Sequence, residues 1–164
     1  MRIFLFVGVL LIGMINAAHA QSLEIGGIEL RLGQKVDEAL RSLSTYQVQY
    51  IGDIWLVSQK VGDMYMSLGV IGATDKIISY ISKSFNINEN EDAPKVYTRA
   101  ANELHRLGGT TCATHERVFS DSLIHGFETQ CGPFKLIYDM PMKDAEGRRI
   151  LGSVSISIRT ELGK

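Results

Sequence analysis

The two cysteines carry the clearest chemical signal in the sequence. Cys112 and Cys131 are the only cysteines among 164 residues, and in an exported chain such a pair is normally oxidised. Residues 110–119 and 123–131 both read as strands, and a turn signal separates them. A two-residue turn at 121–122 pairs residues whose numbers sum to 243, so the two cysteines face each other. The sequence therefore predicts a disulfide-linked hairpin.

The predicted register also says where in the ladder the disulfide lies. Strict alternation from the turn puts Cys112 and Cys131 at a hydrogen-bonded pair, unless a bulge near Gly126 shifts the strands. Closing this loop is expected to stabilise the fold by about 3 kcal/mol. A redox-active pair is the alternative, but the sequence has no close C-x-x-C spacing.

The histidines are candidate metal ligands or acid–base groups. Such a site would combine His115, Glu116 and His125 on the disulfide hairpin. In the predicted register position 125 opposes position 118, so the two histidines are not cross-strand neighbours. No H-x-x-x-H or H-E-x-x-H spacing occurs in the sequence. We expect no metal, and we expect His105 on the surface of a helix.

Other catalytic and metal-binding patterns are missing from the sequence. There is no G-x-S-x-G elbow and no S-x-x-K motif. Asn86, Asn88, Asn90 and Asp92 have the alternate spacing of a calcium loop, but the glycine at the sixth position and the acid at the twelfth are absent. We expect no cofactor and no enzymatic activity; a hydrolase with an unrecognised pair of carboxylates is a third alternative.

Aromatic residues within positions 54–65 are the candidate contacts with a partner. Trp55 and Val57 point to the opposite strand face from Ile54 and Leu56, so one of these faces is either exposed or covered by something else. An exposed aromatic strip is typical of a protein contact site. We therefore assign partner binding to Trp55, Tyr65 and Val57. A carrier of small apolar molecules, with a cavity between helix and sheet, is the alternative.

The first twenty residues read as a secretory signal peptide. Met1-Arg2 gives a positive start, residues 3–12 are apolar residues and glycine, and small residues occupy positions 18 and 20. Cleavage is expected between Ala20 and Gln21, which places the mature protein in the periplasm or outside the cell. A membrane anchor is the alternative, but the apolar run is shorter than the roughly 20 residues of a spanning helix.

Composition limits the function classes of the mature chain. Without the leader, 144 residues remain, with 16 basic and 18 acidic side chains and a net charge of −2. This balance argues against nucleic-acid binding. For the full 164 residues, a hydrophobic content of 45% and a charged content of 21% are typical of a folded domain.

Two similar series of elements follow one another along the mature chain. A strand at 28–32 and an amphipathic helix at 36–43 precede four strands, which Gly-Asp turns at 52–53 and 62–63 help to separate. Residues 86–92 form an acidic linker. A second helix from residue 93 to the Gly108-Gly109 pair then precedes four further strands, ending with 149–158.

The predicted fold is α+β, with two helix-plus-four-strand repeats at 21–85 and 93–164. Short hairpin connections require antiparallel pairing. Each helix has one apolar stripe, so we expect both helices to pack on one face of a largely antiparallel sheet, leaving the other face open.

Residues 28–43 resemble the opening of the small outer-membrane-assembly lipoproteins, in which a strand ending in glycine precedes a short helix with an acidic pair, here Asp37-Glu38. Residues 72–80 are similar to the turn and strand that close that module. The predicted duplication also resembles the β-lactamase-inhibitor protein. The resemblance implies a non-enzymatic protein that works by surface contact. The lipid-bearing cysteine is absent, so membrane attachment is not implied.

The function we expect from these observations is an exported, non-enzymatic protein-binding module. Its partner would be another envelope or secreted protein, bound through the open sheet face and the hairpin tips.

Overall fold

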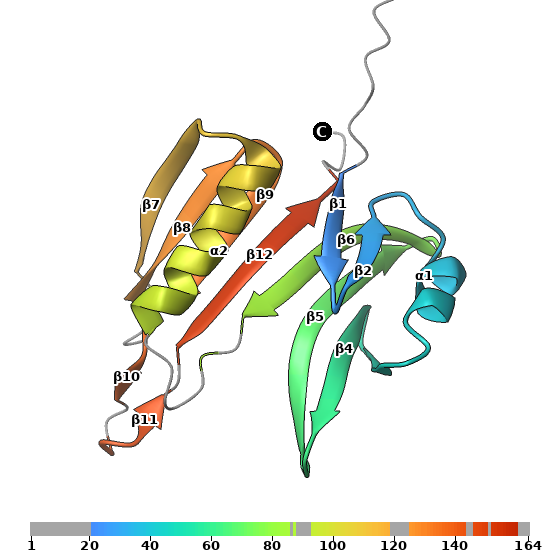
Figure 1. Cartoon of the computed structure of the whole chain (residues 1–164), viewed down its shortest axis with the longest axis horizontal. Helices are drawn as coiled ribbons and strands as arrows, with labels where there is room; N and C mark the ends of the chain where they lie inside the picture. The colour runs from blue at the N-terminus through green and yellow to red at the C-terminus, as the bar shows by residue number, and fades with distance from the viewer. Residues whose placement is uncertain are drawn as a thin grey trace, which may run out of the picture.

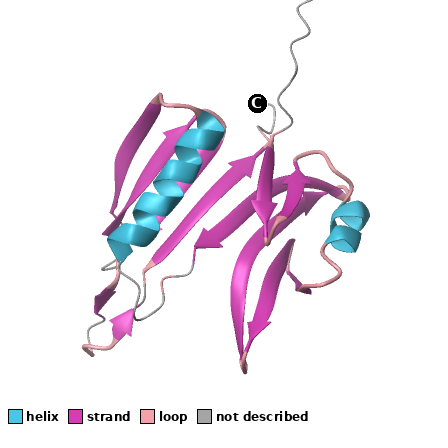
Figure 2. Cartoon of the chain, viewed as in Figure 1, coloured by secondary structure: helices cyan, strands magenta, loops and turns pink. Residues whose placement is uncertain are grey.

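An eight-stranded antiparallel sheet forms the centre of the molecule (Figures 1 and 2). The computed structural model describes residues 21–85, 87, 93–118, 125–143, 146–150 and 152–160. Strands make up 57% and helices 19% of this part. The expected signal peptide, most of the 86–92 linker with the calcium-like spacing, and the 121–122 turn lie outside the described residues.

The sheet joins both halves of the chain edge to edge. Its centre is the antiparallel pairing of the last strand of the first half with the last strand of the second half, in which Ile158 is opposite Ile81. The Gly-Asp turns form as predicted, with a positive φ at Gly52 and Gly62. In spatial order the strands are β3 (Gln47–Ile51), β4 (Ile54–Val61), β5 (Met64–Thr74), β6 (Ile77–Phe85), β12 (Ser153–Arg159), β9 (Phe134–Asp139), β8 (His125–Cys131) and β7 (Cys112–Val118).

The long helix α2 (Ala93–Gly108) lies across one face of the second half of the sheet, over β8, β9 and β12 (Figure 1). Its apolar stripe is buried as the spacing predicts, with Val96, Ala100 and Leu104 fully inaccessible. At its C-terminal end a Cβ on Gly108 would lie 2.2 Å from the carbonyl oxygen of Cys131. The absence of a side chain at Gly108 therefore lets the helix approach the disulfide strand closely.

The first half is built differently, and the prediction of two helix-plus-four-strand repeats is wrong. A hairpin of β1 (Ser22–Ile25) and β2 (Ile28–Arg31) lies on the sheet where the first helix was expected; it contacts β6, and β1 also contacts β12. The helix α1 (Val36–Ser42) has only seven residues and lies at the margin of the molecule (Figure 1). One helix, not two, covers the sheet.

The hairpin displaces the helix because it has more apolar surface to bury. Leu23, Ile25 and Leu30 are 1% exposed or less, and the floor beneath Ile25 is Gly69 of β5. By contrast α1 contributes only Val36 and Ala39 to the core. Backbone bonds hold the segment before α1 to the start of β6: Gly33 N–H donates to the Ile78 carbonyl at 2.8 Å, and Ile78 N–H donates to the Gln34 carbonyl at 2.9 Å.

The remaining described elements are small. β10 (Met142–Lys143) and β11 (Arg149–Ile150) pair as a separate two-stranded ribbon after β9. Among the described residues, neither helix has the length and apolar character needed to cross a membrane.

Candidate functional site

The face of the sheet opposite α2 and the β1–β2 hairpin carries no described helix or strand, and we call it the open face. Strand alternation gives it a floor of small hydroxyl side chains, because the apolar residues of β6 and β12 point to the covered side. Ser82 and Ser157 face each other across the junction of the two halves, as do Ser84 and Ser155. Both halves therefore contribute to one continuous surface.

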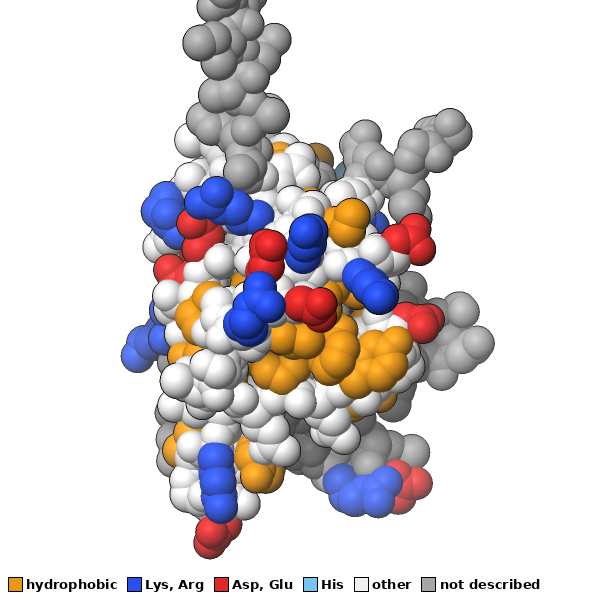
Figure 3. All heavy atoms as spheres, turned by 90° about the vertical axis from the view of Figure 1, so that its right-hand side faces the viewer, with side chains coloured by type: hydrophobic (Ala, Val, Ile, Leu, Met, Phe, Trp, Pro, Cys, Tyr) orange, Lys and Arg blue, Asp and Glu red, His pale blue; other side chains and the backbone are white. Residues whose placement is uncertain are grey.

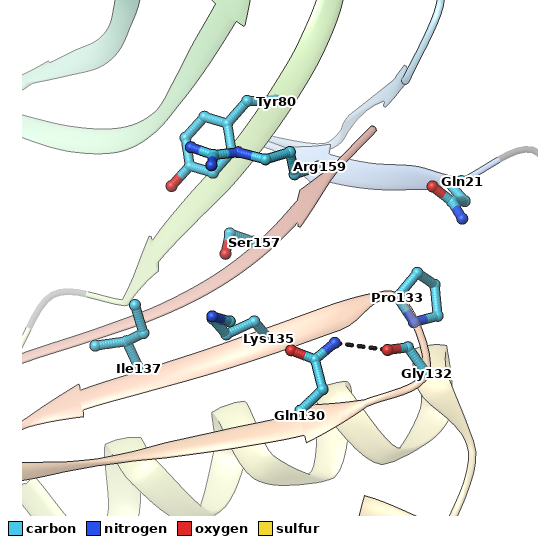
Figure 4. A pocket seen from close by; sticks show the side chains of 9 residues that line it. All are labelled: Gln21, Tyr80, Gln130, Gly132, Pro133, Lys135, Ile137, Ser157 and Arg159. Carbon is cyan, nitrogen blue, oxygen red and sulfur yellow. Dashed lines mark hydrogen bonds between the residues drawn. The ribbon is translucent and has the colours of Figure 1, made fainter. Parts of the chain in front are cut away.

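A hollow of about 410 Å³ lies on the open face, and we call it the polar basin (Figure 4). Tyr80 and Arg159 stand on one side of it, with the guanidinium carbon 5.4 Å from the centre of the ring. Lys135 and Gln130 stand on the other side, and Ser157 lies between the two groups. The Gln130 side chain donates a hydrogen bond to the carbonyl of Gly132 at 2.6 Å.

Two more hollows continue the open face beyond the polar basin. One, of about 450 Å³, shares Tyr80 and Arg159 with it and extends to Ile54, the first residue of β4. The other, of about 420 Å³, lies where β5 leaves β6; Tyr65 and Ser155 are among its lining residues. The pairing of β5 with β6 begins only at Gly69, which opens this gap. The hollows follow one another along the face, so an extended ligand surface fits them better than one small molecule does.

Four charged side chains on the open face form two ion pairs. Lys135 Nζ lies 2.8 Å from Glu128 Oε1. Arg117 Nη1 lies 3.0 Å from Asp139 Oδ1, and the Ser153 hydroxyl donates to Asp139 Oδ2 at 3.0 Å. These carboxylates act as hydrogen-bond acceptors for neighbouring groups, an arrangement suited to binding and orientation more than to proton transfer.

The three predicted contact residues lie in three different environments. Tyr65 is on the open face and is 56% exposed. Trp55 points to the covered side, where it is half-buried and packs against Tyr50 with ring centres 4.7 Å apart and the ring planes tilted by 46°. Val57 is fully buried in the core. Alternation separated the two faces correctly, but Val57 is on the covered face and is inaccessible to a partner.

The predicted disulfide is confirmed. Cys112 and Cys131 are bonded, and β7 pairs with β8 in the predicted register without a bulge. Their Cα atoms are 4.4 Å apart, which is the spacing of a non-hydrogen-bonded pair. The prediction of a hydrogen-bonded pair is therefore wrong. The two-residue turn at 132–133 directs the backbone groups of Cys131 toward β9, leaving its β7 side free of the ladder bonds.

The histidines are apart from one another in the pairing, as predicted. His115 is exposed and opposes Glu128, whereas His125 opposes Val118. The structure adds a neighbour that the sequence did not indicate: a ring nitrogen of His105 lies within 4.8 Å of both disulfide sulfurs. Because these sulfurs are bonded to each other, they offer no thiolate to a metal.

Apolar side chains are exposed on both faces of the β3–β4 edge of the sheet. Tyr50 is exposed on the covered side, and Ile51 and Ile54 are exposed on the open face. Figure 3 shows hydrophobic side chains gathered on this side of the molecule, bordered by Lys, Arg, Asp and Glu. Tyr50, the ring against which Trp55 packs, was not among the predicted contact residues. Both residues flank the Gly52-Asp53 turn at equal distances, and this spacing makes them cross-strand partners.

Comparison with known proteins places the chain in no family. No protein-family model matches it, and neither does any curated protein or solved structure. The function of the chain therefore has to be inferred from the site itself.

Proposed function

We propose that the mature chain is an exported protein-binding module that contacts another envelope or secreted protein through its open face. One observation carries the proposal: in the described part of the chain an eight-stranded sheet is covered on a single face, and its other face has a serine floor with Tyr65, Tyr80 and Arg159 standing above it. Tyrosine and arginine are enriched where protein interfaces concentrate their binding energy.

The packing under α2 favours this function over the carrying of small apolar molecules. Val96, Ala100 and Leu104 fill the space between the helix and the sheet, where Leu136 and Ile156 are also fully buried. The described hollows on the open face are open to solvent and have a mixed lining, in which serines and tyrosines stand beside charged groups in the polar basin and beside Met66, Phe85 and Val154 in the hollow next to β5. A carrier of apolar molecules needs a mostly apolar cavity that excludes water.

The location in the envelope is part of the proposal. Residues 1–20 have the pattern of a cleaved leader, and the disulfide between Cys112 and Cys131 suits an oxidising compartment. The resemblance of residues 28–43 to envelope lipoproteins is consistent with the same location. Mass measurement of the exported protein tests the leader directly, with residue 21 expected at its N-terminus.

Site-specific photo-cross-linking in the native envelope tests the function. A photoreactive phenylalanine analogue replaces Tyr65 or Tyr80 on the open face, or Thr98 or Asn102 on the exposed side of α2 as the control. We expect the open-face positions to form one discrete cross-linked species containing the same partner, and the helix positions to form none. Equal yields from both sets, or no cross-link from either, would overturn the proposal.

A further inference from the structure

The edge strand β3 is the least protected boundary of the sheet. Its sequence, Gln47–Ile51, contains no charge, no proline and no glycine. The opposite edge, β7, carries His115, Glu116 and Arg117, and charged side chains of this kind keep sheet edges from pairing with other chains. Within the described residues, no strand pairs with the outer side of β3 and no backbone hydrogen bond reaches it.

The hairpin geometry identifies the backbone groups that β3 leaves unpaired. Ile51 and Ile54 close the two-residue Gly52-Asp53 turn, and such a closing pair exchanges both of its hydrogen bonds. Alternation from there turns the backbone groups of Gln49 toward β4 and those of Val48 and Tyr50 outward. Two N–H groups and two carbonyls are therefore presented to solvent in line.

We propose that β3 pairs with β3 of a second copy of this chain in an antiparallel, two-fold symmetric arrangement. The symmetry axis passes beside Gln49, so that Val48 of each copy opposes Tyr50 of the other. Both of these residues present outward backbone groups, and the pairing closes four hydrogen bonds. The two-fold relation uses the same patch twice, as in most homodimers.

The side chains of β3 are complementary to themselves in this register. On the covered side each Tyr50, already packed against Trp55, lies against a β-branched Val48; aromatic–β-branched pairs stabilise sheets. On the other side Gln49 meets Gln49 at the axis, and no like charges face each other. Tyr50 is 56% exposed in the single chain, so pairing buries aromatic surface that is otherwise in water.

The small area of the β3–β3 contact limits the affinity of the dimer, and its two-fold symmetry fixes how the two open faces are oriented. Two five-residue strands bury less than the roughly 800 Å² per partner of stable complexes, so we expect a reversible, micromolar equilibrium. Because the axis is perpendicular to the sheet, both open faces lie on the same side of the dimer. A partner with two binding sites would then engage both copies at once and gain from the raised effective concentration.

Cysteine substitution at the axis tests the register. At a non-hydrogen-bonded pair the two Cα atoms are about 4.5 Å apart, within disulfide range. Gln49→Cys is therefore expected to form a covalent dimer on mild oxidation of the mature protein. Gln47→Cys is the matched control: it is equally exposed and on the same strand, but its two copies are about 13 Å apart in this register. Equal yields from the two variants, or none from Gln49→Cys, would overturn the proposal.

A charged residue at the symmetry axis of the dimer tests the monomer–dimer equilibrium without introducing cysteines. Gln49→Lys brings two ammonium groups face to face, so we expect the dimer association constant measured by sedimentation to fall at least tenfold. Gln47→Lys is opposite Ile51 of the other copy, and its association constant should fall less. Trp55 is the only tryptophan, so its fluorescence reports the pairing as concentration rises. A wild-type monomer at all concentrations up to about 1 mM contradicts the dimer. Tyr50→Lys is on the covered side of β3 and should also weaken the pairing. Open-face cross-linking of this variant separates the two proposals, since the protein-binding function does not require the dimer.

Discussion

Lys83 of β6 and Glu103 of α2 are joined by an ion pair, with Lys83 Nζ 3.0 Å from Glu103 Oε1. The two side chains are only 21% and 18% exposed. The contact connects the last strand of the first half to the helix of the second half. It points to the covered side of the sheet, beside the apolar stripe of α2. A charge at this place is tolerated because its partner is in hydrogen-bonding contact.

Removing one member of this pair is expected to destabilise the fold. Lys83→Met leaves the carboxylate of Glu103 without its cation, and we expect a loss of about 2 kcal/mol, between the values for exposed and for fully buried pairs. The double variant Lys83→Met, Glu103→Leu should recover much of this loss, since no charge then remains unpaired. Urea unfolding of the wild type, the two single variants and the double variant measures the coupling free energy between the two side chains. Additive changes in the free energy of unfolding would contradict the coupling.

Gly69 is expected to be intolerant of any side chain. A Cβ there would lie 2.4 Å from the carbonyl oxygen of Ser82 and 2.5 Å from Cδ1 of Ile25. Gly69→Ala should therefore lower the free energy of unfolding by about 1–3 kcal/mol, because the β1–β2 hairpin has to move away from the sheet. Ser84→Ala, on the open face of β6, is the control and should change stability by less than about 0.5 kcal/mol. Similar effects of the two substitutions would show that the hairpin does not pack on Gly69.

The disulfide is expected to contribute substantially to stability. It closes a loop between residues 19 apart in sequence, for which the chain-entropy argument gives about 3 kcal/mol. The double variant Cys112→Ser, Cys131→Ser should lose stability of this order, and a phosphine reductant should destabilise the wild type but not the variant. Thermal unfolding with and without reductant provides the measurement. Unchanged unfolding of the reduced wild type would contradict the expectation.

The sequence predicts most of the strands, because the signals that define them are local. Glycine turns at 52–53 and 62–63 fix both ends of β4, and the spacing of Val96, Ala100 and Leu104 fixes the buried side of α2. The β1–β2 hairpin also had a local signal, since Gly26-Gly27 between alternating residues is typical of a two-residue turn. This hairpin, and not α1, covers the sheet because segments distant in the sequence pack against each other. Hydrophobic periodicity along the chain does not reveal such packing.

The candidate site was less accessible to sequence reasoning. Alternation shows that Val57 and Leu56 lie on opposite faces of β4, but it does not say which of the faces another element covers. The covering element is the β1–β2 hairpin, whose Ile25 lies more than thirty residues earlier in the chain than Val57. The serine floor could not be predicted from the sequence either, because Ser82 and Ser157 come together only through the pairing of β6 with β12. The disulfide was predictable because both cysteines belong to one hairpin.

Glu29 on β2 should titrate below the usual range of a glutamate. The Ser22 hydroxyl donates to its carboxylate at 2.7 Å and the Arg31 guanidinium at 3.1 Å; both lower the pKa of Glu29, the serine more strongly. A lowered folded-state pKa means that the contribution to stability is present above the unfolded-state value of 4.5 and is lost as the pH falls through the folded-state value. Ser22→Ala should raise the pKa of Glu29 in an NMR titration. An unchanged titration would assign the shift to Arg31 alone.

Substitution of Val57 should affect the stability of the fold, whereas substitution of Tyr65 should affect the binding of the partner. Val57→Ala removes two methyl groups from a fully buried site, so we expect a loss of about 2 kcal/mol of stability with little change in the open face. Tyr65→Ala removes an exposed ring and should change stability by less than about 0.5 kcal/mol. If Tyr65 is a contact, its loss should weaken capture of the partner by about tenfold, measured as cross-linking yield from an analogue at position 80. The opposite result, with stability lost at Tyr65 and binding lost at Val57, would place the partner on the covered face and require the hairpin to leave the sheet.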